Sequence, residues 1–117
     1  MASEINHQVI GREFLVRGQE EIQAGELSQG SEKLWGAVAH MTKAAAQRRG
    51  WEHSNHRTLY LVINRLAQET GDSELRDLFL IASQLHANFY EGWLLPEYVE
   101  AEAPRIEELV SRLEALV

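Results

Sequence analysis

Two segments of the chain concentrate side chains that can carry acid–base or anion-binding chemistry. The first runs from Gly25 to Leu59 and the second from Leu85 to Glu91. Histidine exchanges a proton near neutral pH, a carboxylate orients an imidazole, and a cationic side chain holds an anion. If the protein has a ligand site in a groove, we expect these segments to supply its components: Glu32, Lys33, His40, His56, His86, Asn88 and Tyr90.

Helical geometry limits how many of these groups can meet. Glu32 and Lys33 are neighbours and lie about 100° apart around a helix, whereas Asn88 and Tyr90 lie about 200° apart. We therefore expect one of Asn88 and Tyr90 to face the groove. The other should face solvent or a dimer partner.

Two of the histidines also have a structural interpretation. His40 follows Glu32 by eight residues and lies near the same helical face, and His86 lies close to Asn88. Because buried polar groups in proteins are hydrogen-bonded, both imidazoles can be interior groups bonded to Glu32, to Asn88 or to the backbone. The sequence leaves both interpretations open.

The acidic charge is concentrated in the carboxyl-terminal part of the chain. Of 117 residues with a net charge of −7, residues 1–71 contain eight acidic and eight basic ones, and residues 72–117 contain ten and three. Such a surface repels phosphates, so nucleic acid is at most a weak partner. A local basic cluster is the exception, and it supplies the candidates for phosphate contacts: Lys43, Arg48, Arg49 and Arg57.

The composition excludes several classes of site. The chain has no cysteine, which rules out disulfides, zinc–thiolate sites, iron–sulfur clusters and a cysteine nucleophile. The loop histidines His53 and His56 do not complete a zinc shell, so we expect no metal and no cofactor. No apolar run reaches the roughly 18–20 residues of a membrane span, and no secretory leader pattern is present. We expect a soluble, cytoplasmic protein without a membrane partner.

Apolar periodicity predicts helices along almost the whole chain. The first is expected from Ser3 to about Ala24, with an imperfect stripe formed by Ile5, Val9, Phe14, Val16 and Ile22. The second is expected to end at Gly50, with an apolar face formed by Leu27, Leu34, Val38, Met41 and Ala45.

Capping residues delimit two further helices. Ser54 or Asn55 can cap a third helix, which Gly71 ends. Its expected buried face is Leu59, Val62, Ile63 and Leu66. Asp72 or Ser73 can cap a fourth, which ends near Gly92 and should bury Leu75, Leu78, Phe79, Ala82, Leu85 and Phe89.

Two prolines shape the expected fifth helix. Pro96 is a favoured first-turn residue, whereas Pro104 is expected to break or kink the helix. The inward side chains are Ile106, Leu109, Val110, Leu113 and Leu116.

These elements predict an all-α protein, built as one domain over residues 1–117. Short connections favour an antiparallel bundle of four to five helices. Small residues on the second helix allow a neighbouring backbone to come close, so this helix should be central. They are Gly36, Ala37, Ala44 and Ala45.

Several separated motifs resemble the PaREP1 family, a branch of the HEPN-like four-helix bundles. They are Gly25-Glu26, Ser31-Glu32-Lys33, Trp35-Gly36-Ala37, Lys43-Ala44, Ser54-Asn55-His56 with Leu59, and Leu85-His86-Ala87-Asn88-Phe89-Tyr90-Glu91. The resemblance spans about Gly25 to Leu113 and implies an antiparallel, HEPN-like bundle that is often dimeric. HEPN relatives include toxin-type ribonucleases, partners of minimal nucleotidyltransferases and domains thought to bind nucleotides.

The ribonuclease relatives use an arginine followed by a histidine after four to six residues, usually late in the bundle. Here Arg48 with His53 and Arg49 with His56 have this spacing, but around the second loop. At the late position, His86 has no arginine in front of it. We therefore assign no catalytic residue and expect no enzyme activity.

Three functional hypotheses remain. The favoured one is a non-catalytic HEPN-like module that dimerises and binds a nucleotide, an RNA end or a protein partner such as a nucleotidyltransferase. The second is a metal-independent HEPN-type ribonuclease that uses Arg49 with His56 or His86. The third is a structural or regulatory partner protein without a small ligand. In the favoured case, a homodimer is expected to use apolar surface of the second and fourth helices.

Overall fold

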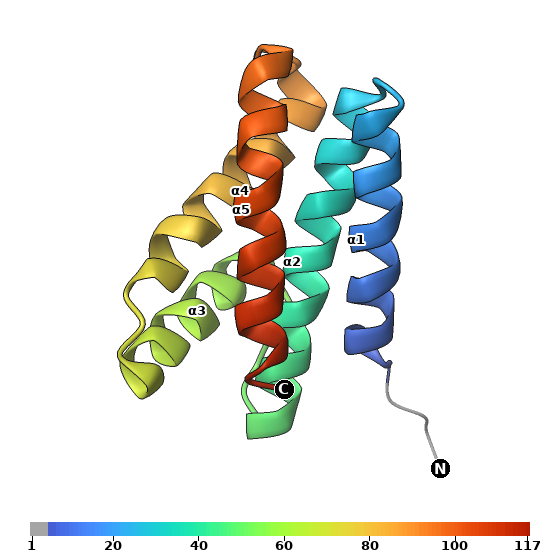
Figure 1. The fold of residues 1–117 in the computed structure, drawn as a ribbon. Helices are drawn as coiled ribbons and strands as arrows, with labels where there is room; N and C mark the ends of the chain where they lie inside the picture. The colour runs from blue at the N-terminus through green and yellow to red at the C-terminus, as the bar shows by residue number, and fades with distance from the viewer. Residues whose placement is uncertain (1–4) are drawn as a thin grey trace.

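The computed structural model of the protein describes residues 5–117, with only the backbone of Tyr90. Its helices are α1 (His7–Gln23), α2 (Leu27–Arg49), α3 (His56–Thr70), α4 (Glu74–Glu91) and α5 (Pro96–Glu114). Helices α1 and α2 run in opposite directions, as do α4 and α5, and the shorter α3 crosses the bundle at an angle before the chain turns back into α4 (Figure 1). The all-α helical bundle predicted from the sequence is confirmed.

Local sequence explains where α3 begins and ends. The Asn55 side chain accepts a hydrogen bond from the backbone N–H of Thr58, and the Thr58 hydroxyl accepts one from the N–H of Asn55. This reciprocal pair satisfies two amides that a helix start leaves unbonded. At the other end, Gly71 has a φ of 75°. Glycine adopts this left-handed conformation without a steric penalty, so the predicted stop is confirmed.

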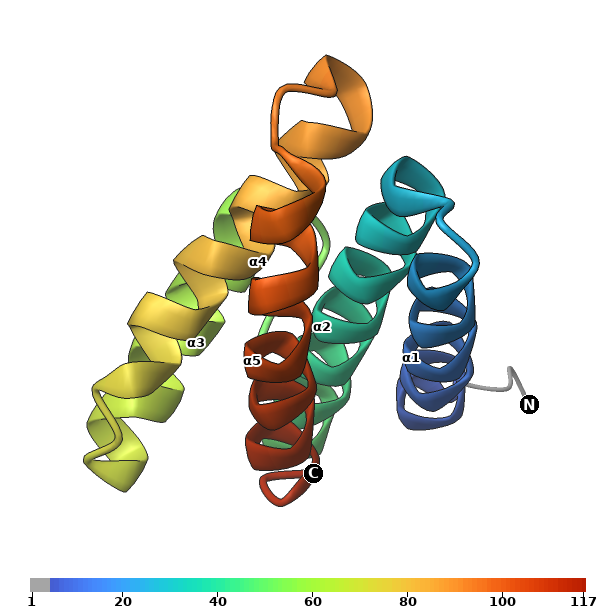
Figure 2. The ribbon, with the colours of Figure 1, turned by 45° about the horizontal axis from the view of Figure 1, so that its top comes forward.

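Helix α2 lies at the centre of the bundle, as predicted. It contacts each of the other four helices, and α5 lies beside it between the α1 and α4 sides of the molecule (Figure 2). Leu34, Ala37, Val38, Met41 and Ala45 on α2 are completely buried. They pack against the predicted faces of α3, α4 and α5, which supply Leu59, Val62, Ile63, Leu66, Leu75, Leu78, Phe79, Ala82, Leu85, Ile106, Leu109, Val110 and Leu113.

The contact between α1 and α2 depends on glycines. A Cβ atom at Gly18 would lie 3.2 Å from the carbonyl oxygen of Gly30, and one at Gly30 would lie 2.5 Å from Cγ1 of Ile22. A Cβ at Gly11 would lie 3.3 Å from the carbonyl oxygen of Ala37. These positions form a seam along which the two backbones approach closely because side chains are missing there.

Two predictions about the helices are wrong. Val9 and Val16, assigned to the buried stripe of α1, are 48% and 52% exposed, because the glycine seam faces α2 instead. Ile5, assigned to the same stripe, is 59% exposed and lies before the start of α1 at His7. Pro104 does not end α5, which continues through it to Glu114. Pro104 lacks an N–H and so removes only one backbone hydrogen bond of the helix. The predicted first-turn position of Pro96 is confirmed, because α5 starts there.

Candidate functional site

Three rings from three helices meet on one face of the bundle. The ring centroids of Trp35 and His56 are 4.9 Å apart at 12°, and those of Trp35 and His86 are 5.0 Å apart at 25°. The two imidazole centroids are only 5.5 Å apart. Imidazoles on opposite faces of the indole would be much further apart, so both lie on the same side of Trp35.

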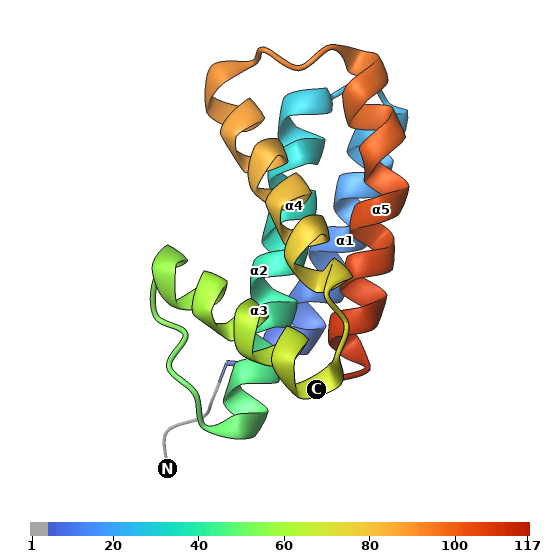
Figure 3. The ribbon, with the colours of Figure 1, turned by 90° about the vertical axis from the view of Figure 1, so that its left-hand side faces the viewer.

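Further contacts extend and fix this group. Tyr60, one turn beyond His56 on α3, stacks on that imidazole at 5.7 Å, and its hydroxyl lies 2.7 Å from Oγ of Ser83 on α4. Nδ1 of His86 lies 2.9 Å from Oε2 of Glu32 on α2. We call Trp35, His56, Tyr60 and His86 the imidazole stack. Its parts come from α2, α3 and α4, and α3 runs obliquely past α2 (Figure 3).

His56 and Tyr60 are the exposed members of the stack, whereas Trp35 beneath His56 is only 6% exposed. Partial burial and the neighbouring His86 lower the pKa of His56 below its usual value. The imidazole is therefore neutral near pH 7, with one N–H donor and one acceptor nitrogen. Neither nitrogen has a hydrogen-bond partner among the residues that the structure describes.

A second histidine cluster joins α1, α2 and the loop after α2. Nδ1 of His7 lies 2.9 Å from Nδ1 of His40, and the ring of His53 meets His7 edge-on at 5.8 Å. Phe14 stacks on His40 at 5.5 Å. Burial, His7 and Lys43 lower the pKa of His40 to about 4, and burial, Lys43 and His53 lower that of His7.

The predicted ligand residues therefore separate into different places. Glu32, His56 and His86 come together at the imidazole stack, whereas His40 belongs to the second cluster. Nζ of Lys33 lies 2.7 Å from Oε1 of Glu21 on α1, on another side of α2.

Of the predicted pair Asn88 and Tyr90, the structure describes only the side chain of Asn88. The amide oxygen of Asn88 accepts a hydrogen bond from the backbone N–H of Leu94 at 3.0 Å, and its nitrogen lies 3.5 Å from the buried hydroxyl of Ser31. Asn88 is 3% exposed and holds the turn between α4 and α5. The side chain of Tyr90 lies outside the described part of the structure.

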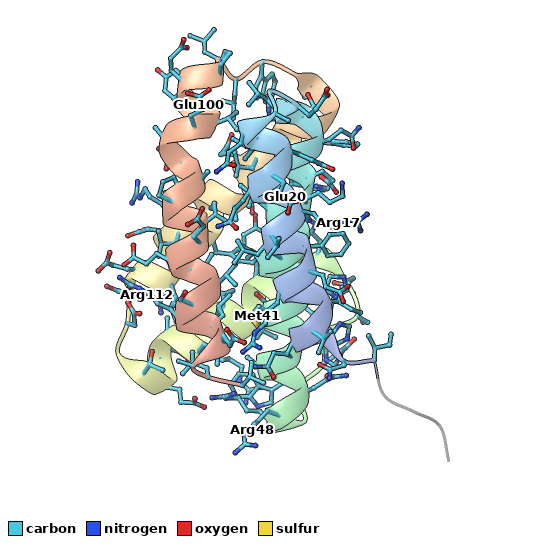
Figure 4. The ribbon with its side chains drawn as sticks, turned by 45° about the vertical axis from the view of Figure 1, so that its right-hand side comes forward. Arg17, Glu20, Met41, Arg48, Glu100 and Arg112 are labelled. Atoms are coloured by element: carbon cyan, nitrogen blue, oxygen red, sulfur yellow. The ribbon has the colours of Figure 1, made fainter. Side chains whose placement is uncertain are left out.

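The basic candidates also have different roles. Arg49 donates to both carboxylate oxygens of Glu69 and to the backbone oxygens of Ala45 and Leu116, so it joins α2 to α3 and to the end of the chain. Arg48 is exposed and projects from the end of α2 (Figure 4). Lys43 is half-buried beside the second histidine cluster, and Arg57 is exposed next to His56.

Sequence reasoning missed three members of these clusters. Trp35 was recognised only as part of a family motif, and neither Tyr60 nor His7 was singled out. A signal existed for Tyr60, because it follows His56 by four residues and so lies on the same side of a helix. His7 had no such signal, because its partner His40 is 33 residues away.

Residues 5–117 contain neither a group of side chains placed to bind a metal ion nor a membrane-spanning helix. No group of three or more histidines and carboxylates there is placed to hold a metal ion. No described helix is both long and apolar enough to span a membrane.

Comparison with known proteins supplies the family. A crystal structure of a protein from Sulfolobus solfataricus superposes with a TM-score of 0.79, covers 98% of both chains and has 18% sequence identity. At this identity the similarity shows a shared fold alone, and no curated protein matches the chain. The sequence model of the archaeal PaREP1/PaREP8 family matches residues 10–110, which is most of the chain. The protein therefore belongs to the PaREP1/PaREP8 family.

Proposed function

We propose that the protein is a non-catalytic helical module that binds a nucleotide or an RNA end at the imidazole stack and that forms a dimer. The observation that carries the proposal is that the ring of His56 is held in a fixed position while its two nitrogens have no hydrogen-bond partner in the described structure. Stacking against Trp35 and Tyr60 holds this ring in place, yet both of its nitrogens are available for a ligand.

The chemistry of the stack suits a nucleotide. A neutral imidazole presents a donor and an acceptor, which is the pattern found on the edges of nucleobases. Tyr60 is 39% exposed and offers an aromatic surface next to that edge. Arg57, exposed beside His56, supplies a positive charge for a phosphate. Because the rings are already fixed by stacking, binding costs little side-chain entropy.

The arrangement of arginines supports binding without catalysis. Cleavage of RNA by histidines needs a cation that stabilises the charge developing on the phosphorus oxygens. Arg49, which has the family spacing to His56, uses its guanidinium on Glu69 and on backbone carbonyls instead. His86 has no arginine in front of it.

The binding proposal can be tested with ribonucleoside monophosphates. We expect a nucleotide to raise the melting temperature of the parent protein and of His53→Ala, whose histidine lies outside the imidazole stack. His56→Ala should lose this rise, because it removes the available ring. A nucleotide-induced rise that is equal in the parent and in His56→Ala would refute a site at the stack.

The two imidazoles favour one alternative, a metal-independent ribonuclease. His56 and His86 are close enough to act on one phosphodiester, and Glu32 would orient the ring of His86. Under our proposal, the purified protein does not cleave a panel of single-stranded RNAs. Cleavage that disappears in His56→Ala or His86→Ala, with stability unchanged, would establish the ribonuclease instead.

The dimer is proposed to form through α3 and α4. None of the large apolar side chains that are exposed in the described structure lies on α2. The expectation that α2 contributes apolar surface to the dimer interface is therefore not supported. Leu61 on α3 and Leu80 on α4 are 50% and 55% exposed. Hydrogen bonds from Tyr60 to Ser83 and from Arg76 to Asn64 hold these two helices side by side. HEPN-like bundles, which the chain resembles, often pair.

Sedimentation of charge-introducing variants tests this interface. We expect the parent and Val16→Glu to sediment as dimers, because Val16 is equally exposed but lies on α1. Leu61→Glu and Leu80→Glu should sediment as monomers, since a buried unpaired carboxylate opposes association. A monomeric parent at about 10 μM, or dimers in all variants, would exclude this interface.

A further inference from the structure

The second histidine cluster borders a polar hollow at the end of the molecule where α2 finishes. The hollow has a volume of about 230 Å³. It is lined by side chains of the first turn of α1, the last turns of α2 and the end of the chain: Asn6, His7, Gln8, Ala44, Gln47, Arg48 and Val117. We call it the His7–Arg48 hollow.

Groups that are positive or can become so surround this hollow. Arg48 lines it and has no carboxylate partner among the described residues, while Lys43 lies close enough to lower the pKa of both His7 and His40. The carboxylate of Glu114 lies near Gln8, but it is already bound by Gln8 and paired with Arg12. The first turn of α1 contains no acidic residue. Apart from the carboxylate of Val117 in the lining, the charged groups at the hollow therefore favour an anion, against the net charge of the chain.

Binding of an anion in the hollow would make it easier to protonate the two facing imidazoles. With Nδ1 atoms 2.9 Å apart, the neutral His7–His40 pair shares one proton between these atoms, and the accepting ring then has its own proton on Nε2. One added proton would make one ring of the pair cationic beside Lys43, and a further proton would put two adjacent positive charges there and break the Nδ1–Nδ1 hydrogen bond, so both rings are neutral in the free protein. A bound dianion would offset this repulsion.

From this geometry we infer that the His7–Arg48 hollow binds a phosphate group, with Arg48 and His7 in its lining as the direct contacts and with Lys43 and His40, which lie behind His7, as the nearby cation and the imidazole partner. Arginine can bind two phosphate oxygens at once, and lysine adds a point charge. The group can belong to inorganic phosphate or to the terminal phosphate of an oligonucleotide, since both present a dianion. The site is separate from the imidazole stack and involves none of its residues.

Phosphate titrations followed through the histidine NMR signals test the inference at constant ionic strength, set with chloride. Inorganic phosphate is expected to shift the signals of His7 and His40 saturably. The dissociation constant should rise at least tenfold in Arg48→Ala and in Lys43→Ala, both of which remove a cation without opening the core. Arg17→Ala is the control, because Arg17 is exposed on α1 away from the hollow (Figure 4), and its constant should stay within twofold of the parent.

A second arm separates the two sources of phosphate. A dinucleotide with a 5′-phosphate that binds more tightly than inorganic phosphate would identify an RNA end, and equal or weaker binding would identify the free ion. Two results would overturn the inference: no saturable shift of His7 or His40, or equal constants in the parent, Arg48→Ala and Lys43→Ala. Neither depends on the imidazole stack, since His56→Ala should bind phosphate as the parent does.

Discussion

The histidines of this protein differ in what surrounds each imidazole. His56 is held by stacking and keeps both nitrogens available, His86 is bound to Glu32, and His7 and His40 face each other. The same residue type thus serves as a candidate ligand group in one place and as a hydrogen-bonded pair, with His7 buried and His40 half-buried, in another. The difference comes from partners on other helices, and it determines the charge of each ring at a given pH.

The His7–His40 pair makes stability depend on pH. The pKa of His40 is about 4 in the folded protein against 6.5 for an unperturbed histidine, and that of His7 is also lowered. The unfolded chain therefore binds more protons below about pH 6.5, so this stability is complete above that pH and is lost as the pH falls toward 4. We expect a lower melting temperature at pH 5 than at pH 7, and a smaller difference in His40→Gln.

The carboxylates titrate at lower pH than the histidine pair, so their contributions to stability can be measured separately. The hydrogen bond from Arg49 lowers the pKa of Glu69, and the one from Gln8 lowers that of Glu114. Stability from these carboxylates is lost only as the pH falls below about 4.5. A parent protein equally stable at pH 5 and pH 7 would contradict the assignment of a neutral histidine pair.

Two neighbouring arginines test the division between structural and binding roles. Arg49→Ala removes the contacts to Glu69 and Leu116 and leaves the backbone oxygen of Leu116 without this donor, so we expect a clear fall in the free energy of unfolding. Arg48→Ala removes an exposed side chain and should change stability by less than about 0.5 kcal/mol. Urea unfolding of both variants measures this. Equal destabilisation would mean that Arg48 is also structural.

At the level of elements, α1 and α2 approach each other closely along a seam of glycines. Gly11, Gly18 and Gly30 occupy the places where larger side chains would hold the two helices apart. The histidine pair spans the same two helices. We infer that the seam sets the distance at which His7 and His40 can meet.

Substitution of the seam glycines measures its contribution. In Gly30→Ala, the new Cβ would lie 2.5 Å from Ile22 and 3.1 Å from the carbonyl oxygen of Gly18, so the helices must shift. We expect destabilisation of about 1–3 kcal/mol despite the better helix propensity of alanine. Gly36→Ala is the matched control, because its Cβ would meet only the Phe14 ring, at 3.3 Å. Chemical denaturation in which Gly30→Ala is as stable as Gly36→Ala would show that the seam is not tight.

At the scale of the whole molecule, α2 is the axis on which both histidine clusters are arranged. Glu32 and Trp35 face the α3–α4 side, and His40 and Lys43 face the start of α1. Covering helices leave no residue of α2 fully exposed between residues 30 and 47. A single central helix therefore positions two separate polar sites, one under α3 and one beside α1.

The sequence predicts this framework well because helix periodicity is a local property. The apolar faces of α2 to α5 are confirmed except toward helix ends, where Leu27, Phe89 and Leu116 are only half-buried, and the Asn55 cap and the Gly71 stop are confirmed. The face of α1 is not, since glycines do not register in an apolar stripe. The clusters depend on how helices cross, so spacing alone grouped His40 with His86, whereas the structure places His40 with His7.

Histidine NMR spectra recorded during a titration with ribonucleoside monophosphates are the most direct test of the proposed function. If the imidazole stack binds a nucleotide, the ring nitrogen signals of His56 will move saturably, those of His86 will follow, and His53 will stay unchanged. Arg57→Ala should weaken the same titration without altering the spectrum of the free protein. Unchanged His56 and His86 signals across the whole panel, at nucleotide concentrations of about 10 mM, would contradict a nucleotide site at the stack.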